Sequence, residues 1–97
     1  MSEKVRKHII FYGRVQGVGF RYYSVYKSRQ LGLTGWVRNL YDGTVEMEVQ
    51  GEQQVIDQLI VFLQNQRFIM IEDTLRRFLL WMTMIFTRGN NIDYMDC

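Results

Sequence analysis

The sequence predicts an α+β sandwich whose elements follow the order β-α-β-β-α-β. Two segments with helical spacing of apolar residues, 20–31 and 52–64, each follow a strand-like segment. An Asp-Gly pair at residues 42–43 separates two further strand-like segments, which is typical of a β-hairpin. Hydrophobic residues make up 47% of the 97-residue chain, and we find no repeat or low-complexity tract. The chain is therefore predicted to form one domain over residues 1–97.

The first strand and the first helix form the opening part of this pattern. A β-branched and aromatic run predicts a strand over Val5–Tyr12. A helix is predicted over Phe20–Leu31, and Gly32 is a typical residue for ending it. Ser24 and Ser28 recur on the apolar side of this helix. Their small side chains should let the helix lie close to the sheet.

The next two strands are predicted to form the hairpin. They span Leu33–Leu40 and Thr44–Gln50, on either side of the Asp-Gly turn. In the later strand, apolar residues alternate with Glu46 and Glu48. One face of the sheet is therefore expected to be apolar and the other to face water. We interpret the two glutamates as an exposed strand face, not as a catalytic or metal-binding pair.

The last two predicted elements complete the pattern. A second helix is predicted over Glu52–Gln64, and a fourth strand over Arg67–Leu75. The residues expected to face the core from the helix are Val55, Leu59, Phe62 and Leu63. This order is that of a ferredoxin-like fold, an antiparallel sheet with two helices on one face.

Residues 76–97 form an atypical C-terminal segment of the predicted domain. The apolar run Phe78–Phe86 fits either a buried strand or a buried helical segment. It is expected to be covered at the sheet edge or in a dimer contact, so we expect a monomer or a weak homodimer formed through this segment. The polar residues 87–97 are expected to form a loose tail.

Composition narrows the classes of function. The net charge of +2 suits a small anionic ligand better than a nucleic acid, which usually meets a strongly basic stripe. The single cysteine, Cys97, forms no intrachain disulfide, and there is no Cys/His cluster for zinc. The charged N-terminus is not followed by the long apolar region of a secretory signal, and no apolar run approaches the ~20 residues of a membrane helix. We therefore expect a cytoplasmic protein without nucleic-acid or membrane partners.

The segment YGRVQGVGFRYY, residues 12–23, contains three glycines and two arginines directly before the first helix. Glycines let the backbone curl so that several N–H groups converge, and a helix N-terminus adds partial positive charge. Arg21 supplies a planar fork that matches two phosphate oxygens. The same letters also fit a glycine-bearing turn with a solvated arginine, which is the commoner meaning of such a pattern taken alone.

Topology places Asn39 near this segment. The first two strands are joined by a helical crossover, so they are predicted to run parallel and to end at the same edge of the sheet. The glycine-rich segment leaves the first strand, and Asn39 lies near the end of the second. We therefore expect the loop and Asn39 to meet at this edge.

Two long motifs resemble the acylphosphatase family. GRVQGVGFR (residues 13–21) and LGLTGWVRNLYDGTVEMEVQG (residues 31–51) occur in the family's order and at its spacing, within roughly the first two thirds of the chain. The resemblance implies hydrolysis of the carboxyl-phosphate bond of acyl phosphates, with inorganic phosphate as product and inhibitor and without a metal or cofactor. It implies catalytic roles for Arg21 and Asn39. The phosphate-binding residues it implies are Gln16, Gly17, Val18, Gly19, Phe20 and Arg21.

The side chains suit this chemistry. The amide of Asn39 can accept from and donate to a water molecule and so orient it, but it is a poor base. The phosphate itself is therefore expected to take the proton. A catalytically weak or silent binding module is the alternative, against which the presence of both Arg21 and Asn39 argues. RNA binding of the RRM type is weaker still, because its aromatic octamer belongs on the third strand, and here that strand reads TVEMEVQ.

Overall fold

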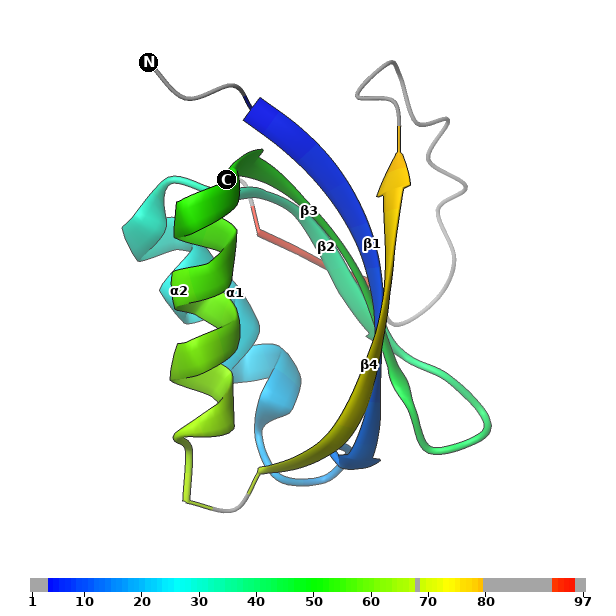
Figure 1. Cartoon of the computed structure of the whole chain (residues 1–97). Coiled ribbons are helices and arrows are strands. Elements are labelled where there is room, and N and C mark those ends of the chain that lie inside the picture. The colour runs from blue at the N-terminus through cyan, green and yellow to red at the C-terminus, as the bar shows by residue number, and fades with distance from the viewer. Residues whose placement is uncertain (1–3, 68, 80–91, 96–97) are drawn as a thin grey trace.

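The computed structural model describes residues 4–67, 69–79 and 92–95, and every structural statement below concerns these residues. Five strands and two helices follow one another along the described chain in the order β-α-β-β-α-β-β (Figure 1). They are β1 (Lys4–Arg14), α1 (Phe20–Leu31), β2 (Thr34–Asn39), β3 (Val45–Glu52), α2 (Gln53–Gln64), β4 (Met70–Leu79) and β5 (Ile92–Tyr94). The sheet has the strand order β4-β1-β3-β2-β5, and all neighbours are antiparallel.

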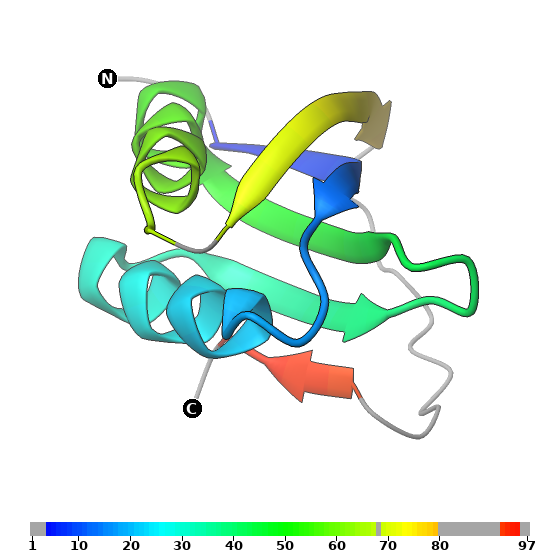
Figure 2. The same cartoon turned by 90° about the horizontal axis from the view of Figure 1, so that it is seen from below.

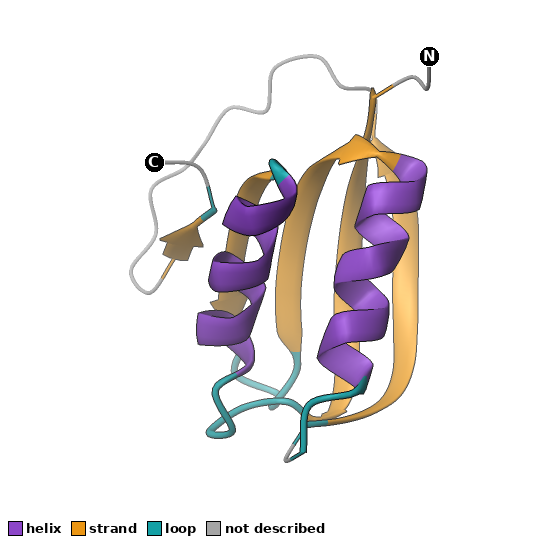
Figure 3. Cartoon of the chain, turned by 90° about the vertical axis from the view of Figure 1, so that its left-hand side faces the viewer, coloured by secondary structure: helices purple, strands orange, loops and turns teal. Residues whose placement is uncertain are grey.

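The predicted ferredoxin-like architecture is confirmed. Both helices cover the same face of the sheet (Figure 3). The first five predicted elements differ from the observed ones by no more than two residues at either end. β4 begins three residues later and ends four residues later than the predicted strand Arg67–Leu75. A further strand, β5, was not predicted.

The core lies between the helices and the sheet. The apolar residues of β3 all face it, as their alternation predicts, and they are completely buried. On α2 the buried residues are Ile56, Leu59, Ile60 and Leu63. The predicted inward residues Val55 and Phe62 are only half-buried. The helix is apolar over a wide arc, so spacing alone did not fix which side of that arc meets the sheet.

Helix α1 approaches the sheet closely, as its serines predict. Ser24 and Ser28 are completely buried, and the Ser24 hydroxyl donates to the carbonyl of Phe20 over 2.8 Å. The Phe20 ring packs on Phe11 of β1, with ring centroids 4.8 Å apart. This contact fixes the first turn of α1 against the sheet, directly after the glycine-rich loop.

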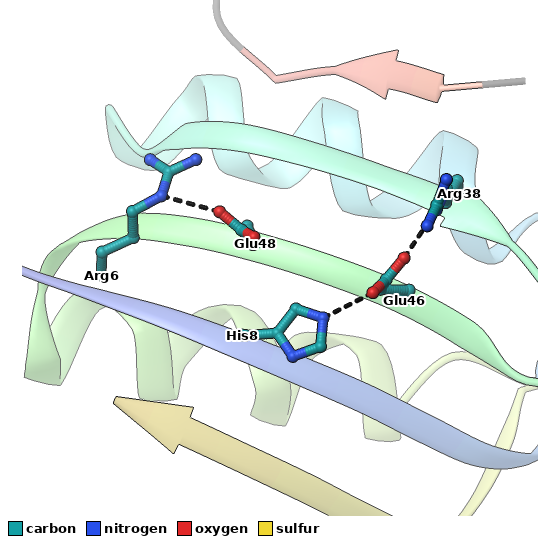
Figure 4. Close-up of polar contacts among 5 residues, drawn as sticks. All are labelled: Arg6, His8, Arg38, Glu46 and Glu48. Atoms are coloured by element: carbon teal, nitrogen blue, oxygen red, sulfur yellow. Dashed lines mark hydrogen bonds and ion pairs between the residues drawn. The ribbon is translucent and has the colours of Figure 1, made fainter. Parts of the chain in front are cut away.

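The prediction that Glu46 and Glu48 form an exposed face is wrong. The Glu48 side chain is 4% exposed and accepts from Arg6 Nε over 2.9 Å. Glu46 accepts from Arg38 Nε and contacts His8 Nε2, each over 2.6 Å (Figure 4). Alternation identified the correct face of the sheet. It did not show that cationic neighbours on β1 and β2 allow carboxylates to be buried there.

The chain end contains structure where a loose tail was expected. β5 pairs with β2, and the N–H of Met95 donates to the carbonyl of Gly35 over 2.9 Å. Met95 is completely buried, and its carbonyl accepts from Arg29 Nε over 3.1 Å. The expectation is therefore wrong for residues 92–95. Most of the apolar run Phe78–Phe86 lies outside the described residues, as does Cys97.

Neither of the two described helices is long and apolar enough to cross a membrane.

Candidate active site

The loop between β1 and α1 owes its shape to two glycines. Gly17 has φ 72° and Gly19 has φ 84°, the left-handed conformation that side chains disfavour. At Gly19 an added Cβ would also lie 3.2 Å from the Tyr23 ring. The buried side chains of Val15 and Phe20 anchor the two ends of the loop in the core. The loop is thus a short curled bridge between fixed points.

The loop leads into the N-terminal end of α1. Gly19 is the N-cap residue and offers no side chain to satisfy the first amides of the helix. The first helical bond runs from the Tyr23 N–H to the Gly19 carbonyl, over 2.9 Å. Amides that precede it have no acceptor within a helix. No acidic residue lies in this first turn, so the positive end of the helix dipole is not neutralised there.

Gln16 ties the loop to the β2–β3 hairpin. Its side-chain NH₂ donates to the carbonyl of Leu40 over 2.7 Å and to that of Thr44 over 2.8 Å. The hairpin itself is closed by the Leu40 N–H, which donates to the Thr44 carbonyl. The carboxylate of Asp42 accepts from the backbone N–H of Thr44 over 3.0 Å. The side-chain amide of Gln16 therefore points toward the hairpin and holds the loop against it.

Asn39 meets the loop at the expected edge of the sheet. β1 and β2 are each antiparallel to β3, so they run parallel and end together. Figure 2 shows the loop passing beside the end of β2. Asn39 and Arg21 line one cavity. The loop residues that also line it are Val15, Gly17, Gly19 and Phe20, whereas Gln16 and Val18 are not among its described lining residues.

The cavity extends well beyond the loop. Its volume is about 1020 Å³, and it continues along α1 past Tyr22, Tyr26 and Arg29. Its other wall is β5, which contributes Asp93 and Tyr94. Arg21 Nη1 lies 3.6 Å from Asp93 Oδ2, in an ion pair that is open to solvent. Sequence reasoning missed both β5 residues, because the polar chain end carried no strand pattern.

The other polar candidates lie away from the cavity. His8, Arg38 and Glu46 form a cluster on the face of the sheet opposite the helices. Burial would raise the pKa of Glu46, but the hydrogen bonds from His8 and Arg38 and the charge of Arg38 outweigh burial and lower it. The guanidinium of Arg38 also lies 5.6 Å from the centroid of the Trp36 ring. These contacts give the three side chains a structural role in holding neighbouring strands of the sheet together.

The acylphosphatase family model matches residues 7–73, which run from β1 into β4. The chain belongs to the acylphosphatase family. It is 55% identical over 56 residues to an acylphosphatase of Bifidobacterium longum, and these 56 residues make up 58% of each of the two chains. Such matches span about three fifths of the curated relatives' length. Beyond residue 73 the family match stops, before the atypical segment 76–97.

Solved acylphosphatase structures have the same fold. The crystal structure of acylphosphatase from Bacillus subtilis is 33% identical, with a TM-score of 0.71 over 77% of this chain and 84% of that one. The acylphosphatase from Coxiella burnetii is 32% identical, with a TM-score of 0.72 over 79% of this chain and 82% of that one. The architecture of this acylphosphatase-family chain is thus shared over most of its length.

Proposed function

We propose that this chain hydrolyses acyl phosphates to a carboxylate and inorganic phosphate. The observation that carries the proposal is the joint placement of Arg21, Asn39 and the glycine loop around one cavity. Membership of the acylphosphatase family supports the reaction. The alternative of a catalytically silent binding module is less favoured, because Arg21 and Asn39 are both present and both line the cavity.

The proposed phosphate site is the curled loop together with Arg21. Its N–H groups and the end of the helix dipole would hold the phosphate oxygens. The Arg21 guanidinium would bind two of them in a planar fork. Gln16 and Val18 would take part through the backbone, since the Gln16 side chain bonds the hairpin and Val18 packs against the core.

In-line attack by water spreads charge over the equatorial phosphate oxygens, and the preorganised loop would stabilise that charge. Asn39 would orient the attacking water through its amide oxygen and NH₂ group. The carboxylate released is a good leaving group, so no general acid is required. We propose that the proton of the water passes to the phosphate. Asp93 is the only carboxylate side chain among the described residues that line the cavity, and it forms an ion pair with Arg21.

Hydrolysis of acetyl phosphate, with and without a chelator, tests the reaction. The wild type is expected to release phosphate equally in both conditions. Arg21→Ala should abolish turnover and also inhibition by inorganic phosphate, because the charge that fixes the phosphate is lost. Inhibition unchanged by this substitution would refute the assignment of Arg21. A wild type that does not hydrolyse acetyl phosphate would refute the reaction.

We further propose a cytoplasmic setting, with small acyl phosphates as substrates and neither nucleic acid nor membrane as partner. RRM-type base stacking finds no support, because β3 carries carboxylates that are paired with Arg6, His8 and Arg38. A monomer or a weak homodimer formed through residues 78–86 is the proposed assembly. Sedimentation of the full chain over a range of concentrations tests this, and a stable higher oligomer would contradict it.

A further inference from the structure

We propose that Arg38, Glu46 and His8 position Asn39 relative to the loop between β1 and α1. The three side chains lie on the face of the sheet opposite the helices (Figure 4), and none of them is among the described lining residues of the cavity. The inference rests on the proposed function, because it takes Asn39 as the residue that orients the attacking water. It adds positioning residues that act on the site from behind the sheet.

The two halves of the proposed site belong to strands that are not neighbours in the sheet. The loop follows β1, Asn39 ends β2, and β3 lies between these two strands. The position of Asn39 relative to the loop therefore depends on how firmly β1 and β2 are both held to β3.

The carboxylate of Glu46 on β3 joins all three strands. Its Oε1 accepts from Arg38 Nε on β2, and its Oε2 contacts His8 Nε2 on β1, each over 2.6 Å (Figure 4). The side chains of Glu46 and His8 are only 14% and 19% exposed. Hydrogen bonds to a charged group that is largely withdrawn from water are stronger than those of an exposed ion pair. The bridge is thus suited to fix the spacing between β1 and β2.

Arg38 passes this constraint to Asn39, which is the next residue. Side chains alternate along a strand, so Asn39 points to the helix side of the sheet, where it lines the cavity. In the register of the sheet, Arg38 pairs with Glu46 on one side and with Ile92 of β5 on the other. Asn39 pairs with Val45 of β3, and the described pairs of β5 end at Arg38. Holding Arg38 therefore holds the strand end from which the Asn39 amide projects.

A second arginine–glutamate pair on the same face of β3 provides a comparison. Arg6 Nε donates to Glu48 over 2.9 Å, and Arg6 Nη1 donates to Gln50 over 3.3 Å. These bonds join β1 to β3 and do not involve β2. The side chains of Arg6 and Glu48 are 7% and 4% exposed, so this pair is buried more deeply than the Glu46 bridge. Loss of the Arg6 pair should therefore cost at least as much stability without moving Asn39.

The test compares Arg38→Met with Arg6→Met in kcat for acetyl phosphate, in the Ki of inorganic phosphate and in urea denaturation. Arg38→Met should lower kcat about tenfold and change Ki by less than about twofold, because a misplaced Asn39 affects the transition state more than bound phosphate. Arg38→Lys, which can still pair with Glu46, should recover most of the lost kcat. Arg6→Met should keep the wild-type kcat despite an equal or larger loss of stability. Glu48→Gln provides the same comparison if Arg6→Met does not fold.

Combining Arg38→Met with Asn39→Ala shows whether Arg38 acts through Asn39. The double variant should have a kcat within about twofold of that of Asn39→Ala alone, because the positioned group is already missing. A further tenfold fall would overturn the inference. An equal fall of kcat in Arg6→Met would also overturn it, since the effect would then be general loosening of the sheet. A raised Ki with unchanged kcat in Arg38→Met would make Arg38 a charge that attracts the anion.

The inference and the proposed function fail in different ways. An unchanged kcat in Arg38→Met would overturn the inference, while hydrolysis of acetyl phosphate by the wild type would leave the proposed function intact. The ¹⁵N heteronuclear NOE of the Asn39 side-chain NH₂ group is independent of turnover. It should be lower in Arg38→Met than in the wild type and in Arg6→Met, because the loosened strand end lets the amide move. Equal values in the wild type and Arg38→Met would overturn the inference even if no substrate were hydrolysed.

Discussion

Replacing Gln16 with alanine is expected to loosen the loop between β1 and α1, the proposed phosphate site, by removing its link to the β2–β3 hairpin. The side chain donates to two carbonyls of the hairpin, those of Leu40 and Thr44, at 2.7 and 2.8 Å. Both bonds are partly buried, so the two carbonyls would keep only part of their solvation after the substitution. At about 0.5–1.5 kcal/mol for each bond, the free energy of unfolding should fall by about 1–3 kcal/mol.

Urea denaturation at neutral pH measures this loss, and acetyl phosphate hydrolysis measures its effect on the site. Because Gln16 links the loop to the hairpin that follows Asn39, kcat/KM should fall along with stability. Gln54→Ala, at an exposed glutamine of α2, controls for the loss of an amide side chain. A Gln16→Ala variant with unchanged stability would refute the structural role of the two bonds. Lost stability with full activity would show that the loop does not depend on its link to the hairpin.

Three further substitutions test other contacts. Folding lowers the pKa of Glu46, so the stability that its carboxylate contributes should be complete above the unfolded-state pKa and disappear as the pH falls through the folded-state value. In urea denaturation between pH 6 and 3, the free energy of unfolding should therefore fall less steeply with pH in Glu46→Gln than in the wild type. Equal slopes would contradict this. Asp93→Asn should lower the Ki of inorganic phosphate about threefold to tenfold, because a carboxylate 3.6 Å from Arg21 competes with the anion; a higher Ki would show that Asp93 positions Arg21. Ser24→Leu should destabilise the fold by about 1–3 kcal/mol through overpacking beneath α1, measured by urea denaturation, and an unchanged free energy of unfolding would show room between α1 and the sheet.

The central juxtaposition could be predicted because it depends on chain order. A helical crossover forces β1 and β2 to run parallel, so the loop and Asn39 must reach the same edge of the sheet. The bounds of α1 were also predictable, since apolar spacing began at Phe20 and Gly32 ended the helix. In both cases the decisive signal was local in the sequence.

The missing parts depend on contacts between distant segments. β5 has three residues and no apolar alternation, and it exists through pairing with β2 and burial of Met95. The burial of Glu48 likewise depends on Arg6, which lies 42 residues earlier and comes beside it only once β1 and β3 are in register. Local sequence patterns do not show which distant segments will pair. The β5 wall of the cavity and the buried charges were therefore not predicted.

The account depends most directly on Asn39 as the residue that orients the attacking water. The measurement is kcat for acetyl phosphate together with the Ki of inorganic phosphate, in the wild type and in Asn39→Ala. Asn65→Ala, at the exposed end of α2, is the matched control. We predict a fall in kcat of about 100-fold with Ki changed by less than about threefold, because the lost contact acts in the transition state. A wild-type kcat with weakened phosphate binding would contradict the account and make Asn39 a binding residue.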